Sequence, residues 1–539
     1  MKKKIIIISV LVFLGIVFVS LHKKYSGFFI QKKIIEKDLG VYASTIPTFT
    51  NVALDFVHEY QKDNYAFAGS ALIDIDSDGV EEIFIGGGQN QSDGLFRFQN
   101  GSTGSPRDGQ FVNIAIQSGF VNKVMATGGA LSIDFDNDND IDLLVIRLDG
   151  IYLFLNNNGK FEEQKLNITI EKDAVPLSLS VTDLNKDGLV DIYVSTFKSP
   201  KLHKGVFNDP SSRSNNLMLL NKDNNVFEDI TKKSGLTYNQ NTFQVSFVDV
   251  NNDSWPDLVI APDTDRVVIY ENKKDGTFEI KPPLTDFGYW MGLAIGDIDN
   301  DGDQDLFFSN IGNTIPLIAT RKDLKLEQKL DEKWALLRND GDFKFTNITK
   351  EKKLDDYEFA WGALFADLNL DGLEDLLVVE NYVNWPLHKF KKLFGRVFLQ
   401  ENNKNFSPIT KVSGLENPYY GTSPLIADFD KDGYPDVVFV NFNGPSRAFI
   451  NNGGNYKYIK VIFPDSARYL GTRVDMEKLD GSKISKQIIG GVGLMTDVSN
   501  ELIFGIGVDI EVKSVTVTFT DGTVKKLKNI KMGSRVQIK

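Results

Sequence analysis

Short apolar runs alternate with clusters of aspartate, asparagine and glycine along most of this chain. An apolar run rich in glycine and alanine, such as 69–73, leads into an acidic cluster, and a nearly all-apolar run, such as 142–146, leaves it. Apolar runs of this length between turn-forming residues predict short β-strands. The second kind of run is apolar at successive positions, which is typical of a strand buried on both faces.

The acidic clusters share one frame that recurs at a near-constant spacing. Seven copies begin at Asp74, Asp134, Asp183, Asp249, Asp297, Asp367 and Asp428, with a mean step of about 59 residues. A third apolar run ending in asparagine follows each strand pair, as in 151–157, and a fourth run follows at 227–231, 345–349 and 406–410. Four strands in each of seven copies predict an all-β fold, a seven-bladed β-propeller.

The first and last copies predict how such a ring would close. Residues 49–53 resemble the fourth run of a copy but precede the first copy, and the seventh copy passes from its third run into a different region. We therefore expect 49–53 to complete the seventh blade, which would remove an open sheet edge.

Each acidic loop has oxygen-bearing side chains at positions 1, 3, 5 and 9. Alternate carboxylates in a tight turn converge on one point, and calcium takes six to eight oxygen ligands. Because all seven copies share one frame, metal binding is favoured over the alternative that these clusters of aspartate, asparagine and glycine are only turns. The loops predict up to seven structural Ca²⁺ ions. The predicted ligands are Asp74, Asp76, Asp78 and Glu82; Asp134, Asp136, Asp138 and Asp142; Asp183, Asn185, Asp187 and Asp191; Asp249, Asn251, Asp253 and Asp257; Asp297, Asp299, Asp301 and Asp305; Asp367, Asn369, Asp371 and Asp375; and Asp428, Asp430, Asp432 and Asp436.

Two other positions of the loop refine this prediction. Position 6 is glycine in five copies, where we expect a left-handed backbone. Asn139 in the second copy tolerates this conformation and Ser254 in the fourth tolerates it less, which makes the fourth loop the weakest candidate. Position 12 is apolar in every copy, whereas an EF-hand requires a bidentate glutamate at that position. The loops are therefore not EF-hands.

The net charge supports a cation-binding protein. The formal net charge is −13 and the pI is about 5.0, and seven divalent ions would compensate the acidic excess. Clustered carboxylates repel one another without a counter-ion, so the metal-free loops should be strained. The low pI and the absence of a basic stripe argue against nucleic-acid binding.

The N-terminus predicts export. Residues 5–21 carry no charge and have lysines on both sides, which predicts a signal anchor or transmembrane segment over 1–24, followed by a connector over 25–45. A cleaved signal is the alternative, which would make the protein secreted. The chain has no cysteine, which excludes a lipoprotein anchor. Weak calcium modules work at extracellular calcium levels, so we expect the body to face the periplasm or the outside of the cell.

Two resemblances follow from these motifs. The acidic loop followed by an apolar strand resembles the FG-GAP/VCBS repeat of integrin α-subunit propellers, where such loops bind calcium. The tail, with motifs at 469–474, 490–496, 502–507 and 515–523, resembles the ASPIC/UnbV domain. This order is that of the cartilage acidic protein family and its bacterial relatives. We divide the chain into a propeller over 46–452 and a small β domain over 453–539. The resemblance implies calcium binding and adhesion-like or scaffold roles, and it supplies no catalytic residue.

The sequence gives little indication of catalysis. The four histidines, His22, His58, His203 and His388, form no metal-binding pattern, and no nucleophile elbow or phosphate-binding loop is present. We expect His58 to lie at the surface or at a strand edge. No helix is predicted after Gly490-Gly491, so we interpret that segment as a turn and not as a phosphate site.

The longest insertions predict where a partner binds. Segments 196–215, 309–334 and 380–396 each follow a second strand, so they should lie on the face opposite the metal loops. Several aromatic residues belong to the same side and either form a stacking surface or pack between blades: Tyr289, Trp290, Trp361, Trp385, Tyr419 and Tyr420.

Together these features predict an exported, calcium-binding module for adhesion or scaffolding, with a cell-surface or secreted protein or glycan as partner. The alternative is an envelope enzyme, for example a carbohydrate-active one, that uses carboxylates on the insertion face.

Overall fold

A computed structural model describes residues 46–539 except for short gaps. The gaps lie at 61–67, 121–124, 199–212, 224, 312–327, 358, 381–392, 403–404, 509–510, 529 and 539. The predicted signal anchor and most of the three long insertions lie outside the described residues. None of the helices in the part that is described has both the length and the apolar character needed to cross a membrane.

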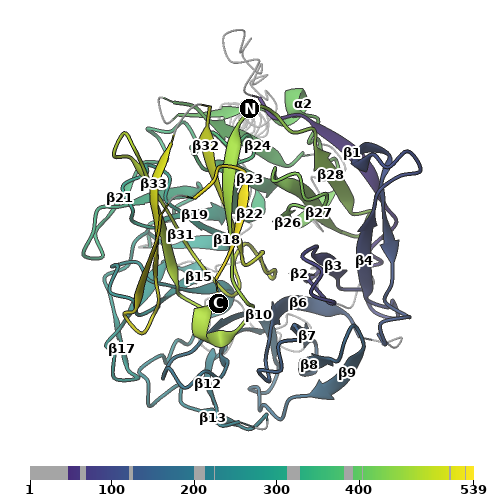
Figure 1. Ribbon diagram of the computed structural model, residues 1–539. Coiled ribbons are helices and arrows are strands. Elements are labelled where there is room, and N and C mark those ends of the chain that lie inside the picture. Colours follow the sequence, from purple (N-terminus) through teal and green to yellow (C-terminus); the bar gives the residue numbers. More distant parts are fainter. Residues whose placement is uncertain are drawn as a thin grey trace, which may run out of the picture. The chain divides into compact units, whose positions relative to one another are not determined.

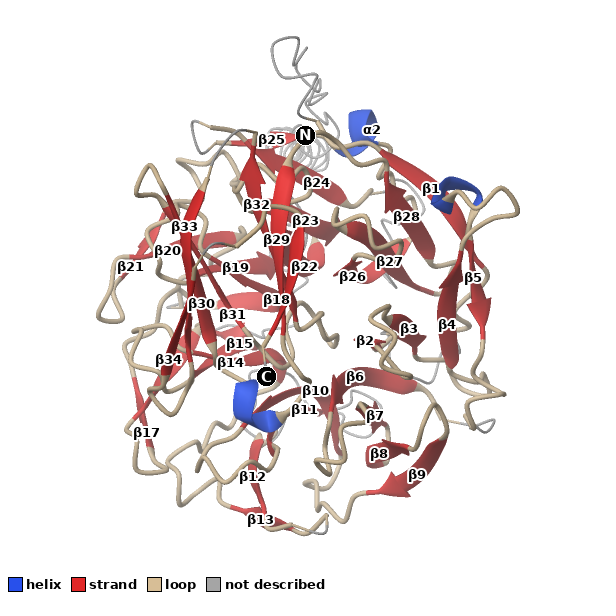
Figure 2. Cartoon of the chain, in the orientation of Figure 1, coloured by secondary structure: helices blue, strands red, loops and turns tan. Residues whose placement is uncertain are grey.

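Strands make up nearly all of the regular secondary structure in the described chain, and they are organised in antiparallel units of four (Figures 1 and 2). The units are β2 (Ser70–Ile73), β3 (Glu82–Ile85), β4 (Gly94–Gln99) and β5 (Gln110–Asn113); β6 (Thr127–Ile133), β7 (Asp142–Arg147), β8 (Gly150–Asn156) and β9 (Phe161–Lys165); β10 (Ala174–Thr182), β11 (Asp191–Lys198), β12 (Leu217–Asn221) and β13 (Phe227–Asp229); β14 (Thr242–Val248), β15 (Asp257–Asp265), β16 (Val268–Asn272) and β17 (Phe278–Ile280); β18 (Gly288–Gly296), β19 (Asp305–Asn310), β20 (Ala335–Asn339) and β21 (Phe345–Asn347); and β22 (Ala360–Ala366), β23 (Asp375–Glu380), β24 (Arg396–Gln400) and β25 (Phe406–Pro408).

The last unit takes its fourth strand from the start of the described chain. It contains β26 (Tyr420–Ala427), β27 (Asp436–Phe442) and β28 (Arg447–Asn451), and β1 (Phe49–Leu54) pairs with β28 antiparallel. The pairing predicted for 49–53 is therefore present. β1 also pairs with β5 in parallel, which joins the last unit to the first.

The first strands of the units contact one another in chain order, from β2 through β6, β10, β14, β18 and β22 to β26, and β26 contacts β2. The series of units therefore closes on itself, and the arrangement is propeller-like. The second strands have fully buried side chains in almost every case, as their apolar sequences predict. Apolar clusters fill the space between neighbouring units.

The C-terminal region forms two small sheets. β29 (Lys457–Ile462) pairs with β32 (Glu501–Gly507) and with β35 (Ser534–Gln537), while β30 (Arg473–Lys478) and β33 (Val512–Thr518) pair between β31 (Lys483–Gln487) and β34 (Val524–Leu527). Their apolar faces belong to one cluster that also contains residues of the second and third units. The C-terminal domain is thus packed directly on the strand units.

Candidate metal centre

The acidic loops connect the first and second strands of the units, and their geometry comes from hydrogen bonds to their own backbone. In the second loop, Asp134 Oδ1 accepts from the N–H of Asp138 at 3.1 Å, and its Oδ2 accepts from the N–H of Asn139 at 3.1 Å. The same two bonds recur at position 1 of most other loops. These bonds explain why the chain turns where aspartate occupies position 1.

Two positions of every loop have left-handed backbone. Position 6 has a φ between 67° and 98° in all copies, which confirms the prediction and includes Asn139 and Ser254. Position 4 is left-handed as well, at Ser77, Asn137, Lys186, Asn252, Asn300, Leu370 and Lys431. Asparagine, which adopts this conformation more readily than most residues, stands there in three copies, whereas at Leu370 the conformation is unfavourable for the side chain.

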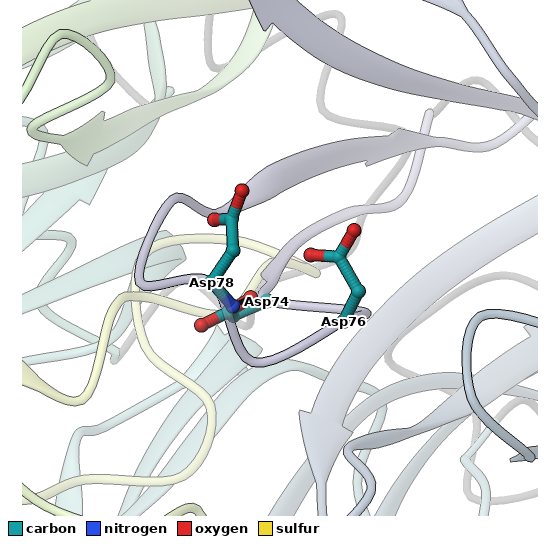
Figure 3. A group of neighbouring side chains, drawn as sticks. All are labelled: Asp74, Asp76 and Asp78. Atoms are coloured by element: carbon teal, nitrogen blue, oxygen red, sulfur yellow. Dashed lines mark hydrogen bonds between the residues drawn. The ribbon is translucent and has the colours of Figure 1, made fainter.

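Four of the loops bring three carboxylate oxygens within 4.8 Å of one another: Asp74, Asp76 and Asp78; Asp134, Asp136 and Asp142; Asp297, Asp299 and Asp305; and Asp428, Asp430 and Asp436. Figure 3 shows the first group, in which the side chains of Asp76 and Asp78 extend to the same side of the loop. These separations suit several oxygens around one cation.

The carboxylate at position 9 also organises the fold. Asp142 Oδ2 accepts from the N–H of Phe135 at 2.9 Å, and its Oδ1 accepts from the N–H of Asn156 at 2.7 Å. The third to seventh units repeat both bonds. Each carboxylate oxygen keeps a second lone pair, so the position can hold the strands together and still contribute to a cation site.

Sequence reasoning missed the role of the asparagine that ends the third strand. Asn156 Nδ2 donates to the carbonyl of Ile75, at position 2 of the preceding loop, over 3.0 Å. Asn339, Gln400 and Asn451 make the corresponding bond to Val250, Ile298 and Leu368 of the preceding units. These side chains join the first, fourth, fifth and sixth acidic loops to the next unit. The recurrent asparagine was visible in the sequence and was the available signal.

Three loops have asparagine at position 3, and there the side-chain amide donates to the aspartate at position 5. The distances are 2.9 Å for Asn185 to Asp187 and for Asn251 to Asp253, and 3.1 Å for Asn369 to Asp371. The amide oxygen accepts from the N–H of position 5 in the same three loops. Position 3 of these loops therefore offers one oxygen, where an aspartate offers two.

Burial and crowding raise the pKa of most loop carboxyls. Burial, followed by neighbouring carboxylates, raises the pKa of Asp134 to about 6 and that of Asp142 to about 7. In the fifth loop, the same causes raise the pKa of Asp297 to about 7 and that of Asp305 to about 8. The charged form of these groups is unfavourable without a counter-ion.

The residues present fit a hard divalent cation. Each loop offers oxygen atoms alone, which is the donor set of calcium rather than of zinc or copper. Asp428 Oδ1 is buried and has no hydrogen-bond partner, although Asp428 lies at position 1 of the seventh loop. A buried carboxylate oxygen without a partner is costly, and a cation would satisfy it.

The C-terminal domain covers the acidic loops. The backbone N–H of Ser485 donates to Asp297 Oδ2 at 3.1 Å, Gln487 Oε1 accepts from the N–H of Asp249 at 3.0 Å, and the carbonyl of Asp465 accepts from the N–H of Asp134 at 2.6 Å. Further contacts reach the other loops, from Lys460 to Asp428, Arg535 to Gly79, Gly507 to Leu370 and Thr520 to Lys186. A cavity of about 540 Å³ remains between the C-terminal domain and the first two loops.

Residues 490–497 of the C-terminal domain contact the first strands of several units. Their backbone and side chains bond Ser70, Ser132, Ser180, Gln244, Ser246 and Leu293. Asp497 is 2% exposed and accepts from the N–H and hydroxyl of Ser132 at 2.9 and 3.0 Å and from the N–H of Gly491 at 3.1 Å. The segment interpreted as a turn therefore lies along the inner strands.

Several aromatic residues proposed for a stacking surface are buried instead. Tyr289, Trp290 and Trp361 are each less than 9% exposed, which agrees with packing between units. Tyr419 is exposed, Tyr420 is half-buried, and Trp385 lies outside the described residues. The prediction that His58 lies at the surface was wrong, because the side chain is 2% exposed and Nδ1 accepts from the N–H of Asn443 at 3.2 Å.

Comparisons with known proteins find similarities for both parts of the chain. The FG-GAP-like repeat family matches residues 134–194, 249–308 and 394–439, and the ASPIC and UnbV family matches 465–539. Cartilage acidic protein 1 of Homo sapiens is 20% identical over 493 residues, covering 84% of this chain and 69% of that protein. The Xenopus tropicalis protein is 21% identical, with 85% and 70% covered.

Similar solved structures share little sequence with this chain. The crystal structure of BBS1N in complex with ARL6DN has a TM-score of 0.42 and 10% identity, covering 75% of this chain and 97% of that one. The crystal structure of an ancestral GH74 enzyme has a TM-score of 0.40 and 10% identity, covering 88% and 64%.

Proposed function

We propose that this chain, which joins FG-GAP-like repeats to an ASPIC and UnbV domain as the cartilage acidic protein family does, is an exported seven-bladed calcium-binding propeller. It acts as a binding, adhesion or scaffold module at the cell envelope. Six units of four strands, with a last unit completed by β1, support the blade count.

The observation that carries the calcium proposal is the convergence of three carboxylate oxygens within 4.8 Å in four separate loops. Burial raises the pKa of these groups, so the loops are least stable when they are charged and empty of metal. Calcium would compensate the charge and take oxygen ligands from positions 1, 3, 5 and 9. Its role is structural, because the loops connect the inner strands of the units.

The expected stabilisation is substantial. At a calcium concentration ten times the dissociation constant, each occupied loop gains about 1.4 kcal/mol. The stabilisation from several occupied loops together is comparable to the free energy of unfolding of a whole domain, which is about 5–15 kcal/mol. Extracellular calcium near 1 mM would meet this condition for sites with dissociation constants near 10⁻⁴ M, which favours an exported location.

A partner has access to only part of the surface. Because the C-terminal domain contacts the acidic loops, we expect a secreted or cell-surface protein or glycan to bind on the face that carries the long insertions. The predicted signal anchor at 1–24 would hold the protein at the membrane.

Affinity capture tests this function. The calcium-loaded full chain, immobilised and exposed to envelope glycans and surface proteins, should retain a partner without altering it chemically. Release of a cleaved sugar product would contradict a pure binding role. A failure of the chain to bind calcium would contradict the metal assignment.

A further inference from the structure

The first and seventh loops contain cationic side chains of the protein itself, in contact with predicted calcium ligands. Arg97 on β4 reaches the first loop, and Lys460 on β29 reaches the seventh. This feature distinguishes them from the second loop, whose ligands Asp134, Asp136, Asp138 and Asp142 form no ion pair with any lysine or arginine in the described part of the chain.

In the first loop, the guanidinium joins two of the four predicted ligands. Arg97 Nη2 lies 2.7 Å from Asp76 Oδ2, and Nε lies 2.5 Å from Glu82 Oε1. Glu82 is 1% exposed, and its Oε2 accepts from the N–H of Ile75 at 3.1 Å. Positions 3 and 9 therefore already pair with an internal cation, and a calcium ion at this loop would have to compete with the guanidinium for both carboxylates.

The residue types of the first unit explain this difference. Glutamate replaces aspartate at position 9, and its longer side chain reaches the third strand. The fifth unit also has an arginine opposite position 9, Arg338, but its guanidinium pairs with Asp340 at 2.8 Å instead of with the loop. An arginine opposite position 9 is therefore not enough to place a guanidinium in the acidic loop. In the first unit, the longer Glu82 side chain together with Arg97 does so.

In the seventh loop, the cation comes from the C-terminal domain. Lys460 Nζ lies 2.6 Å from Asp428 Oδ2 and 2.7 Å from Glu501 Oε2, and the side chains of Lys460 and Asp428 are 0% and 1% exposed. Asp428 Oδ1 remains without a partner, so the ammonium compensates the charge of position 1 without filling the loop. A calcium ion bound at Oδ1 would be repelled by this buried ammonium.

These two loops belong to the units where the series of strands closes. β1 pairs with both β28 and β5 across that closure, and Lys431, at position 4 of the seventh loop, donates to the carbonyl of Asp78 in the first loop at 2.9 Å. Loss of the closing contacts would open the whole ring of units. Internal cations at this place would keep the closure intact when calcium is low.

We propose that Arg97 and Lys460 act as built-in cations of the first and seventh loops, so that these loops bind calcium at least about tenfold more weakly than the second loop. The proposal rests on the calcium-binding function above. It assigns a weaker dependence on calcium to the two loops at the closure than to the second loop.

Matched substitutions at position 3 test the proposal. We would count the calcium ions bound to the full chain by native mass spectrometry at about 0.1 mM free calcium. Asp136→Asn in the second loop should remove one ion, whereas Asp76→Asn in the first loop should leave the count unchanged. Equal losses in the two variants, or a loss in Asp76→Asn alone, would overturn the proposal.

Removal of the internal cations provides the converse test. Arg97→Gln and Lys460→Met should each tighten calcium binding at one loop, seen by isothermal titration calorimetry as about tenfold stronger affinity for one additional ion. Both variants should also melt at a lower temperature in chelator and recover in calcium. Weaker or unchanged calcium binding in both variants would overturn the proposal. If the unsubstituted chain binds no calcium at all, the proposed function fails, and this result is distinct from equal behaviour of the loops.

Discussion

Replacement of Asn156 by alanine tests the role of the asparagines that end the third strands. The Asn156 side chain is 3% exposed, its Nδ2 donates to the carbonyl of Ile75 at 3.0 Å, and its Oδ1 accepts from the N–H of Gly159 at 2.8 Å. Asn156→Ala removes both bonds and leaves the carbonyl of Ile75 without its partner in the neighbouring unit.

The expected cost follows from these contacts. Two hydrogen bonds contribute about 1 kcal/mol each, and a buried carbonyl without a partner adds a similar amount, which gives about 3 kcal/mol. If the whole described chain unfolds together, its unfolding entropy is on the order of 1 kcal/mol per degree, so the melting temperature should fall by about 3 °C.

The neighbouring residue provides the control. Asn157 is exposed, and its side-chain Oδ1 accepts from Asn158 Nδ2 at 3.1 Å. Scanning fluorimetry at one heating rate in saturating calcium would compare Asn156→Ala with Asn157→Ala. If the two variants melt at the same temperature, the bond between units contributes nothing to stability, and the reasoning is refuted.

Three further predictions concern other buried groups. Burial lowers the pKa of His58 to about 4, below its unfolded value of 6.5, so folding favours the neutral form and stability should be lost as pH falls from 6.5 towards 4. At pH 5.5 the loss of unfolding free energy is about 1 kcal/mol. In urea titrations, His58→Phe should abolish this part of the acid sensitivity. Asp497→Ala leaves three donors at Ser132 and Gly491 without an acceptor. The variant should lose about 3 kcal/mol of stability, measured as a shift of the urea midpoint. An unchanged midpoint would show that 490–497 is not part of the stable core. Gly505→Ala would place its Cβ 1.9 Å from Asp367 Oδ2 and 2.5 Å from the backbone of Leu370. The substitution should therefore cost about 3 kcal/mol of stability and make the C-terminal domain more sensitive to limited proteolysis. Equal cleavage rates for the variant and the unsubstituted chain would contradict the close contact.

Local sequence patterns predicted the repeated strands because each strand and its loop lie within a few residues of one another. The left-handed position 6 and the pairing of 49–53 with the last unit followed from the same repeat, and the comparisons confirm the suspected family. Calcium as the bound ion stays a prediction.

The contacts that sequence reasoning missed join residues far apart along the chain. Lys460 and Asp428 belong to different domains, and Asp497 meets Ser132 across most of the sequence, so no local period relates them. The burial of His58 also depends on a distant segment, around Asn443. The asparagine contacts between units were missed for another reason: the pattern repeats locally, but its partner is in the preceding repeat.

A thermal melt of the full chain in calcium, magnesium or chelator, combined with a count of bound ions by calorimetry, would show whether calcium stabilises the fold. Calcium should raise the melting temperature well above the value in chelator, with several ions bound and a much smaller effect of magnesium. Equal melting temperatures and no bound ions would show that the acidic loops are held by hydrogen bonds alone, and the account of a calcium-stabilised propeller would be wrong.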